Sequence, residues 1–257
     1  MSKNVLRYLT VGALVLVASP SMAAEQEFYE LRIYRNSDAA RQAAVVNYLD
    51  GALVPALNRM GVKTVGVFVP TGGKPEVPLT DVYVLIPFSD LTQFAASGGI
   101  LAADEAYTAA ASDFMAAEKK DPAYIRLESR LMRAFAGMPV LEVPGSDSEE
   151  RLLELRIYES HNTQKARRKV EMFNDGEIEV MKEVKLGPVF FGETLISNDV
   201  PNLTYMLSAP SEEAHGEHWG GFGKHPRWQV LKKMEKYKGT VSSIRSIKLK
   251  PAACSQI

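Results

Sequence analysis

The sequence predicts an α+β protein made of two similar halves, each with four strands and two helical regions. A five-residue segment recurs unchanged, at Glu30–Tyr34 and at Glu154–Tyr158, and the same order of elements follows each copy. The composition is that of an ordinary globular chain: 257 residues, 46% hydrophobic and 24% charged. This length is sufficient to bury a core, and the composition excludes collagen, bulk disorder and a disulfide-stabilised miniprotein.

The first copy contains one long amphipathic helix whose apolar residues, among them Val45, Leu49 and Leu53, recur at helical spacing. Gly61 is expected to end this helix. β-branched and aromatic runs bounded by glycine and proline predict the strands. The predicted elements are a strand over 27–34, a helix over 38–60, strands over 62–69 and 82–86, helical segments over 90–97 and 100–118, and a strand over 124–135.

The second copy repeats this order after a linker over 137–150, which contains two prolines and an acidic end. Its predicted elements are a strand over 152–158, a helix over 163–185, strands over 189–196 and 203–207, a second helical region, and a strand over 241–249. Each copy is therefore βαββαβ, the ferredoxin-like order. The predicted divisions are 1–23 (signal peptide), 24–136 (repeat 1), 137–150 (linker), 151–250 (repeat 2) and 251–257 (tail).

A ferredoxin-like sheet carries helices on one face only, so its other face needs a cover. The second copy can supply it, which predicts two tandem repeats packed sheet to sheet as an intramolecular dimeric α/β barrel. Side chains alternate along a strand, so Leu31 and Ile33 point to one face, and Glu30, Arg32 and Tyr34 to the other. We expect the apolar pair to meet the helices and the Glu-Arg-Tyr set to face the barrel interior or the seam between repeats.

The Tyr-Glu-Leu-Arg-Ile-Tyr start, the long first helix and the tryptophan-rich second helical region resemble the NIPSNAP family, which belongs to the dimeric α/β barrel superfamily. The resemblance covers residues 26–250. It is closer in the second copy, where His218-Trp219 and Pro226-Arg227-Trp228 match the aromatic region of the family. The first copy has alanine-rich sequence over 100–117 there. The resemblance implies the fold and carries no established reaction.

The densest chemical constellation lies within 213–229 and holds three of the four histidines and both tryptophans. Its members are His215, His218, Trp219, Phe222, His225 and Trp228. Histidine moves protons near neutral pH, and aromatic rings line sites for flat ligands. His218 and His225 are the catalytic candidates, and Trp219, Phe222 and Trp228 the ligand-binding ones.

The spacing of the histidines matches no metal motif, so no metal or cofactor is expected, with haem on an axial histidine as the alternative. Gly220, Gly221 and Gly223 are expected to bend the chain before His225. Core packing of both tryptophans is the favoured structural interpretation.

The repeated Glu-Arg-Tyr face has two interpretations. Arg32 or Arg156 would bind a ligand carboxylate, with Tyr34 or Tyr158 adding a hydrogen bond. Alternatively, each arginine neutralises the glutamate two residues before it, and the presence of the pair in both copies favours this architectural role.

The N-terminus predicts a cleaved secretory signal. Lys3 and Arg7 precede an apolar run that is too short to span a bilayer, and small residues favour cleavage after Ala23. We therefore expect a secreted or periplasmic protein without a stable membrane anchor after cleavage. Cys254, the single cysteine, is expected in a frayed tail and cannot form an intramolecular disulfide.

The formal net charge of -1 gives no general reason to expect nucleic acid. Residues 24–145 carry 11 basic and 15 acidic residues, and 146–257 carry 17 and 16. The basic runs at 165–169 and 232–238 are interpreted as solvated helix faces. No phosphate loop or nucleophile elbow is present. Homo-oligomerisation stays open.

These observations predict an exported NIPSNAP-like protein of unknown reaction that binds a small hydrophobic or aromatic molecule in its barrel. Two alternatives remain. One is a small-molecule monooxygenase or haem-binding or haem-degrading enzyme of the dimeric α/β barrel type, and the other is a structural or interaction protein.

Overall fold

The computed structural model describes residues 25–143, 145, 148 and 150–257, so the predicted signal peptide lies outside the described residues. The first half contains β1 (Phe28–Arg35), α1 (Ala39–Tyr48), the π-helical turn η1 (Leu49–Leu53), α2 (Val54–Arg59), β2 (Gly66–Lys74), β3 (Val82–Phe88), α3 (Leu91–Ala103), α4 (Glu105–Ala110), α5 (Ser112–Met115) and β4 (Arg126–Ala134). The second half contains β5 (Leu152–Glu159), α6 (Thr163–Met172), η2 (Phe173–Glu177), α7 (Ile178–Glu183), β6 (Pro188–Ile196), β7 (Asn202–Ala209), α8 (Glu212–Lys224), α9 (Pro226–Leu231), the 3₁₀ turn η3 (Glu235–Tyr237) and β8 (Ser243–Pro251).

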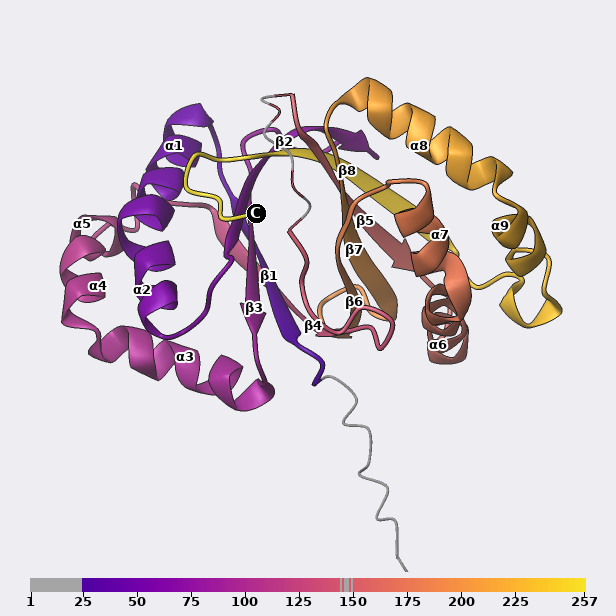
Figure 1. The fold of residues 1–257 in the computed structure, drawn as a ribbon. Helices are drawn as coiled ribbons and strands as arrows, with labels where there is room; N and C mark the ends of the chain where they lie inside the picture. The colour runs from indigo at the N-terminus through magenta and orange to yellow at the C-terminus, as the bar shows by residue number, and fades with distance from the viewer. Residues whose placement is uncertain (1–24, 144, 146–147, 149) are drawn as a thin grey trace, which may run out of the picture.

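The eight strands form one closed antiparallel barrel in the order β1-β3-β2-β8-β5-β7-β6-β4 (Figure 1). Each half contributes four consecutive strands, and the pairs β2–β8 and β4–β6 join the halves. β1 and β5 lie on opposite sides of the barrel. Helices α1–α5 cover one side and α6–α9 the other. The predicted intramolecular dimeric α/β barrel is confirmed.

The barrel interior is filled by apolar side chains from all eight strands. Leu31 and Leu155 are fully buried there, and Ile33 is 5% exposed, in one cluster with Phe68, Phe190 and Met206. The predicted orientation of the repeated pentapeptide was therefore wrong. An eight-stranded barrel is just wide enough for side chains to fill, so its interior takes the apolar residues. The Glu-Arg-Tyr set lies on the outer face, under the helices.

The long first helix of each half is built in the same way. Asp38 and Asn162 cap α1 and α6 by accepting a hydrogen bond from the backbone N–H three residues on. Both helices then pass through a π-helical turn, at Leu49–Leu53 and Phe173–Glu177, which lie 124 residues apart, like the pentapeptides. Residues of α1 and α6 can therefore be compared at this offset.

Several elements differ from their predicted limits. The break expected between the helical segments 90–97 and 100–118 was wrong: α3 continues through Gly98 and Gly99 to Ala103, and two short helices then end at Met115. The strand expected from residue 62 begins at Gly66, because Val62 and Val65 are buried in a connection rather than paired, and it continues to Lys74 because β8 of the other half pairs with it. Helix α8 runs through its glycines to Lys224 and ends where Pro226 follows. The expected bend within the glycines was wrong.

The C-terminal tail is also packed rather than frayed. The side-chain oxygen of Gln256 accepts a hydrogen bond from the Val65 backbone N–H at 2.9 Å, and Ile257 lies in the barrel-interior cluster. Cys254 is half-buried against the first-half core, and burial raises the pKa of its thiol. The tail thus attaches the end of the second half to the first.

The linker also contacts the barrel: the Glu142 N–H donates to the Val189 carbonyl at 3.0 Å. Across the described part of the chain, no helix is both long and apolar enough to cross a membrane. The same residues contain no group of three or more His, Cys, Asp or Glu side chains arranged to hold a metal ion.

Candidate functional site

A buried polar cluster lies between β5 and α8 in the second half. Glu154 is at its centre: one carboxylate oxygen accepts from Arg156 Nη1 at 2.5 Å and from the Ser246 hydroxyl. The other oxygen lies 2.9 Å from His215 Nε2 and accepts from Trp219 Nε1 at 3.1 Å. Two strands and one helix therefore converge on a single carboxylate.

This convergence sets the ionisation of Glu154. Burial raises the pKa of its carboxyl group, but the bond to His215, the Arg156 charge and the Ser246 hydroxyl outweigh burial and hold the pKa at about 2. The carboxylate orients His215 through Nε2. When Nε2 donates to Glu154, Nδ1 is the acceptor nitrogen, and it is a buried atom without a hydrogen-bond partner among the described residues.

Aromatic side chains surround this cluster. The Arg156 guanidinium lies 4.8 Å from the centre of the Trp219 ring and 5.4 Å from that of Tyr158. Trp219 contacts Phe222 edge-on at 5.3 Å, and Phe222 contacts Trp228 at 4.6 Å. Five of the predicted ligand-binding residues thus form one continuous assembly, which is consistent with the predicted packing role of the tryptophans.

Below these rings lies a buried ion pair that the sequence did not indicate. Lys169 Nζ is 2.6 Å from Glu177 Oε2, and both side chains are at most 5% exposed. Burial raises the pKa of Glu177, and the Lys169 charge opposes that rise. The predicted solvated basic run therefore contains one residue, Lys169, that points into the core. Its neighbours Arg167 and Arg168 are exposed, as expected.

Of the two catalytic candidates, neither lies on Glu154. His218 lines a separate groove together with Lys182 and Glu142, and His225 Nε2 lies 3.0 Å from Glu183. The residue that the structure brings to the carboxylate is His215. Its position four residues before Trp219 was a usable signal, because the two share a helix face.

The first half retains the strand part of this arrangement. Arg32 Nη2 lies 2.9 Å from Glu30 Oε2, and Ser129 donates to Glu30 Oε1 at 2.7 Å. Tyr34 packs edge-on against Tyr124 at 5.3 Å. Arg32 and Tyr34 thus lie under the first-half helices, on the other side of the barrel from Arg156 and Tyr158, so the predicted ligand-binding residues do not form a single site.

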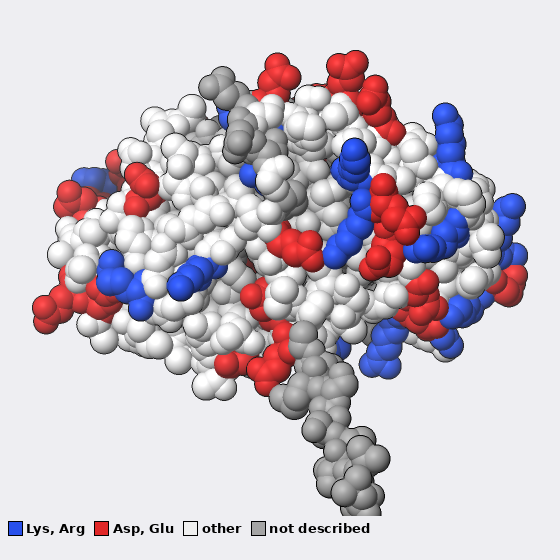
Figure 2. All heavy atoms as spheres, viewed as in Figure 1, with Lys and Arg blue, Asp and Glu red and all other residues white. Residues whose placement is uncertain are grey.

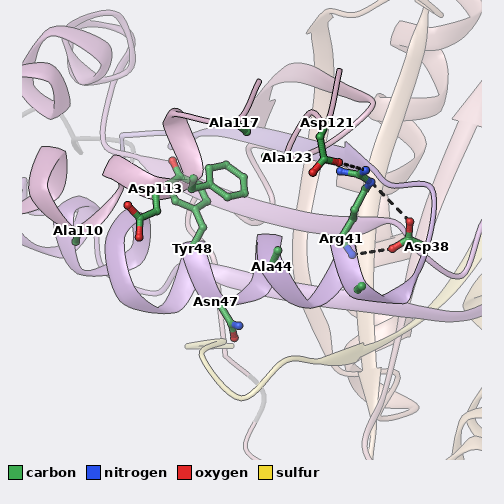
Figure 3. Close-up of a pocket in the computed structure, with 12 residues that line it drawn as sticks. Asp38, Arg41, Ala44, Asn47, Tyr48, Ala110, Asp113, Ala117, Asp121 and Ala123 are labelled. Carbon is green, nitrogen blue, oxygen red and sulfur yellow. Dashed lines mark hydrogen bonds and ion pairs between the residues drawn. The ribbon is translucent and has the colours of Figure 1, made fainter. Parts of the chain in front are cut away.

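The first half instead has an open groove between α1 and α5 (Figure 3). Its volume is about 700 Å³. The Phe114 ring lies flat on that of Tyr48, with centroids 4.0 Å apart and planes 4° apart. Small side chains make up much of the rest of the lining: Ala40, Ala44, Ala110, Ala117 and Ala123. The alanine-rich sequence that departs from the NIPSNAP pattern supplies one part of this lining, namely Ala110, Asp113, Phe114 and Ala117.

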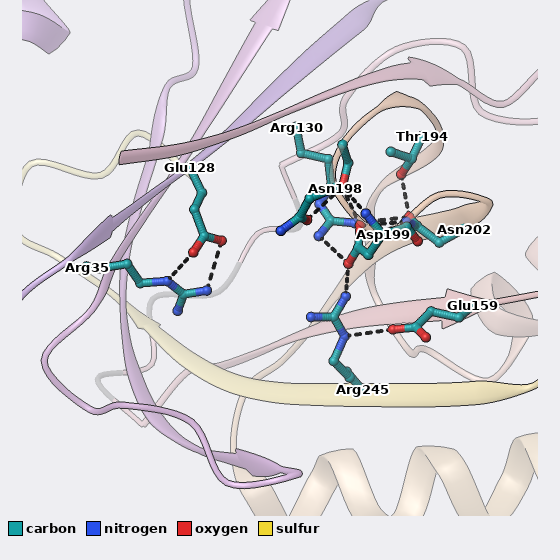
Figure 4. A network of polar contacts seen from close by, with 10 residues as sticks. Arg35, Glu128, Arg130, Glu159, Thr194, Asn198, Asp199, Asn202 and Arg245 are labelled. Atoms are coloured by element: carbon teal, nitrogen blue, oxygen red, sulfur yellow. Dashed lines mark hydrogen bonds and ion pairs between the residues drawn. The ribbon is translucent and has the colours of Figure 1, made fainter. Parts of the chain in front are cut away.

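A second cavity, of about 390 Å³, lies at one end of the barrel, with Ile33, Ile157 and Ile247 in its wall. Polar residues from both halves line it (Figure 4). Asp199 accepts from Arg130 at 2.9 Å and also from Arg245, and Arg35 binds Glu128 through two nitrogens. Arg130 belongs to the first half and Asp199 to the second, so this network joins the repeats.

The NIPSNAP family model matches residues 153–256. That match covers the second half, and assignment of residues 24–136 to the family stays a prediction. No curated protein matches the chain.

Solved structures match over most of the length. A "putative monooxygenase" from Lactobacillus acidophilus NCFM has a TM-score of 0.58 at 12% identity, covering 88% of this chain and 94% of its own. An anthrone oxidase-like protein has a TM-score of 0.50 at 9% identity, covering 90% and 93%. A NIPSNAP-like domain protein from Burkholderia xenovorans covers 40% of this chain and 87% of its own, with 16% identity and a TM-score of 0.37. At these identities the first two matches establish the shared barrel fold.

Proposed function

We propose that this protein binds a small, flat, apolar molecule in the α1–α5 groove of the first half. The observation that carries the proposal is an open groove with a stacked pair of aromatic rings and alanine side chains in its lining. Its volume of about 700 Å³ lies within the range of small-molecule sites, which are mostly apolar with a few polar groups. The sequence predicted a ligand in the barrel, but apolar side chains fill the barrel interior. We therefore assign the ligand to this groove instead.

The second half has larger, charged side chains at positions that correspond to the lining of this groove. Ala44 corresponds to Arg168 at the 124-residue offset, and Asn47 to Glu171. In the second half, Arg168 binds Glu171 at 2.5 Å, and Lys236 also reaches Glu171, at 2.8 Å. The substitution of arginine by alanine leaves space where a ligand ring can lie against Tyr48 and Phe114.

Calorimetric titration with the neutral bicyclic 2-naphthol tests this proposal. Ala44→Arg introduces the second-half residue into the groove and should lower affinity at least tenfold. Ala43→Arg is the matched control, because Ala43 is exposed on the same helix but does not line the groove; its affinity should equal that of the wild type. No binding to the wild type, or equal losses in both variants, would disprove the proposal.

Proton transfer by the Glu154–His215 pair is a second candidate function, favoured by the unpartnered His215 Nδ1. A carboxylate that fixes one ring nitrogen leaves the other as a base. The names of the two structures with the same fold, a "putative monooxygenase" and an anthrone oxidase-like protein, suggest the substrate type. For anthrone, loss of the ring C–H proton gives a carbanion that reduces O₂, so anthrone and O₂ yield anthraquinone and water.

His215 is 7% exposed, so this second function requires the side chains that cover it to move and admit substrate. Its test is the rate of anthraquinone formation from anthrone in air. The wild type should exceed buffer, His215→Gln should remove the excess, and His161→Gln, at an exposed histidine, should retain it. A His215→Gln variant as fast as the wild type would contradict a base role.

We also propose that the protein is exported, as its N-terminal sequence predicts. N-terminal sequencing of the protein recovered from an expressing cell should then find Ala24 first. A chain that still begins at Met1 would contradict cleavage.

A further inference from the structure

The charged side chains that line the α1–α5 groove differ in whether they have a partner of opposite charge. Arg41 is the one cation in the lining of this groove, and it is already bound: it contacts Asp121 at 2.5 Å and Asp38 at 3.6 Å, and donates to the Pro122 carbonyl. Figure 3 shows Arg41 held between these two carboxylates at one end of the groove. Arg41 therefore has little capacity left for an anionic ligand.

Asp113, in contrast, lines the groove without a cationic partner in the described part of the chain. The Ser112 hydroxyl donates a weak hydrogen bond to Asp113 Oδ1 at 3.4 Å. The neighbouring residue Phe114 carries the ring that stacks on Tyr48. An unpaired carboxylate thus lines the same groove as this aromatic pair.

The surrounding sequence offers no cation to pair with it. Residues 75–118 contain no Lys or Arg but seven acidic residues. On the face shown in Figure 2, blue side chains are sparse over the first-half helices and frequent over the second-half helices. The groove lining carries three aspartates against Arg41.

The second half shows what occupies the corresponding place when the protein supplies its own cation. Lys236 Nζ lies 2.8 Å from Glu171 and 2.9 Å from Asp175, and 4.5 Å from the centre of the Tyr237 ring. Glu171 corresponds to Asn47, a residue of the groove lining. In the second half this face of the long helix therefore binds an ammonium group between carboxylates and an aromatic ring.

We propose that the ligand of the first-half groove is a flat aromatic molecule with a cationic centre, which Asp113 binds. This inference rests on the proposed function. Aromatic faces attract cations through their quadrupole, and a carboxylate adds direct charge attraction. The apolar part of the ligand lies along the alanines and the Tyr48–Phe114 stack. Its cation lies beside Asp113 of α5, because the first-half residues that correspond to Glu171 and Asp175 are the uncharged Asn47 and Gly51.

Titration with N-methylquinolinium and with neutral 2-naphthol, which have the same bicyclic size, tests the charge preference. The wild type should bind the cation about threefold more tightly, as expected for an exposed carboxylate, and this preference should decrease with added salt. Asp113→Asn should abolish the preference without changing 2-naphthol affinity, and Asp113→Glu should retain it. Glu105→Gln is the control: it removes a negative charge from α4 outside the groove lining and should leave the preference intact.

The outcomes separate the two proposals. Equal wild-type affinities, or a preference that survives in Asp113→Asn, would overturn the cationic ligand while groove binding stands. Failure of both compounds to bind the wild type would overturn both proposals.

Discussion

The two halves of this barrel share a strand framework and differ in what lies between that framework and the helices. Both keep a glutamate, an arginine, a tyrosine and a serine on the outer face of the same strands. The second half covers them with His215 and Trp219 and buries a lysine–glutamate pair, whereas the first has apolar residues there and an open groove. The two halves therefore share the barrel framework and differ in the helix-covered space.

The buried pair shows this divergence most directly, because Lys169 and Glu177 correspond to Val45 and Leu53 in the first half. Lys169→Val should lower the free energy of unfolding by about 3 kcal/mol, since it leaves Glu177 buried without a partner. The loss should shrink at lower pH, because Glu177, whose pKa burial raises, then takes a proton. Urea unfolding measures both effects.

The double variant Lys169→Val/Glu177→Leu copies the first half and serves as the control. It should recover stability to within about 1 kcal/mol of the wild type or exceed it, because apolar replacement of a buried ion pair is often neutral or stabilising. If the double variant is as unstable as the single one, the second half needs this pair for packing and the two halves are not interchangeable here.

The two central carboxylates, Glu154 and Glu30, should contribute differently to the free energy of unfolding. Glu154→Gln should cost about 3 kcal/mol, because four groups contact that carboxylate, and Glu30→Gln about half as much, because Ser129 and Arg32 alone contact Glu30 in the described structure. Urea unfolding of both variants at pH 7 makes the comparison. Equal losses would show that the α8 contacts add nothing to stability.

The acid sensitivity of the second half follows from the same carboxylate. The pKa of Glu154 is lowered from its usual value near 4.5 to about 2, so its stabilisation is complete above pH 4.5 and is lost as the pH falls towards 2. The shift corresponds to about 3 kcal/mol. Asp199, whose pKa is also about 2, contributes to the same decline. Glu154→Gln should therefore flatten the stability profile between pH 4.5 and 2 without abolishing its slope, and an unchanged profile would contradict the assignment.

Sequence alone predicted the repeat, the order of elements and the closed barrel, because these depend on periodicity and on a repeated pentapeptide. It gave the wrong face for Leu31 and Arg32, because alternation along a strand defines two faces without saying which one lies inside. Trp219 and Arg156 were each predicted as ligand-binding residues, but neither their contact nor the pairing of His215 with Glu154 was predicted. Both depend on how α8 packs over β5, which the sequence pattern does not specify.

The α1–α5 groove could not be predicted from the sequence, for a different reason. It arises from missing bulk at Ala44 and from the stacking of Tyr48 on Phe114, residues that are 66 positions apart and have no common motif. Lys169 was misread because a basic run gives no sign of the one member that lies on the buried side of the helix. Such features depend on the packing of helices against the sheet, which the local pattern does not specify.

The smallest expected difference concerns the serines that both halves share. Ser129→Ala should cost about 1 kcal/mol, because Glu30 loses its one hydroxyl donor, and Ser246→Ala about half of that, because three other groups still contact Glu154. Both changes remove a single oxygen from a strand, so urea unfolding with an unchanged slope isolates the hydrogen bond. A larger loss at Ser246 would mean that the contacts around Glu154 strengthen one another, so that the second half behaves as a cooperative network and the first as separate pairs.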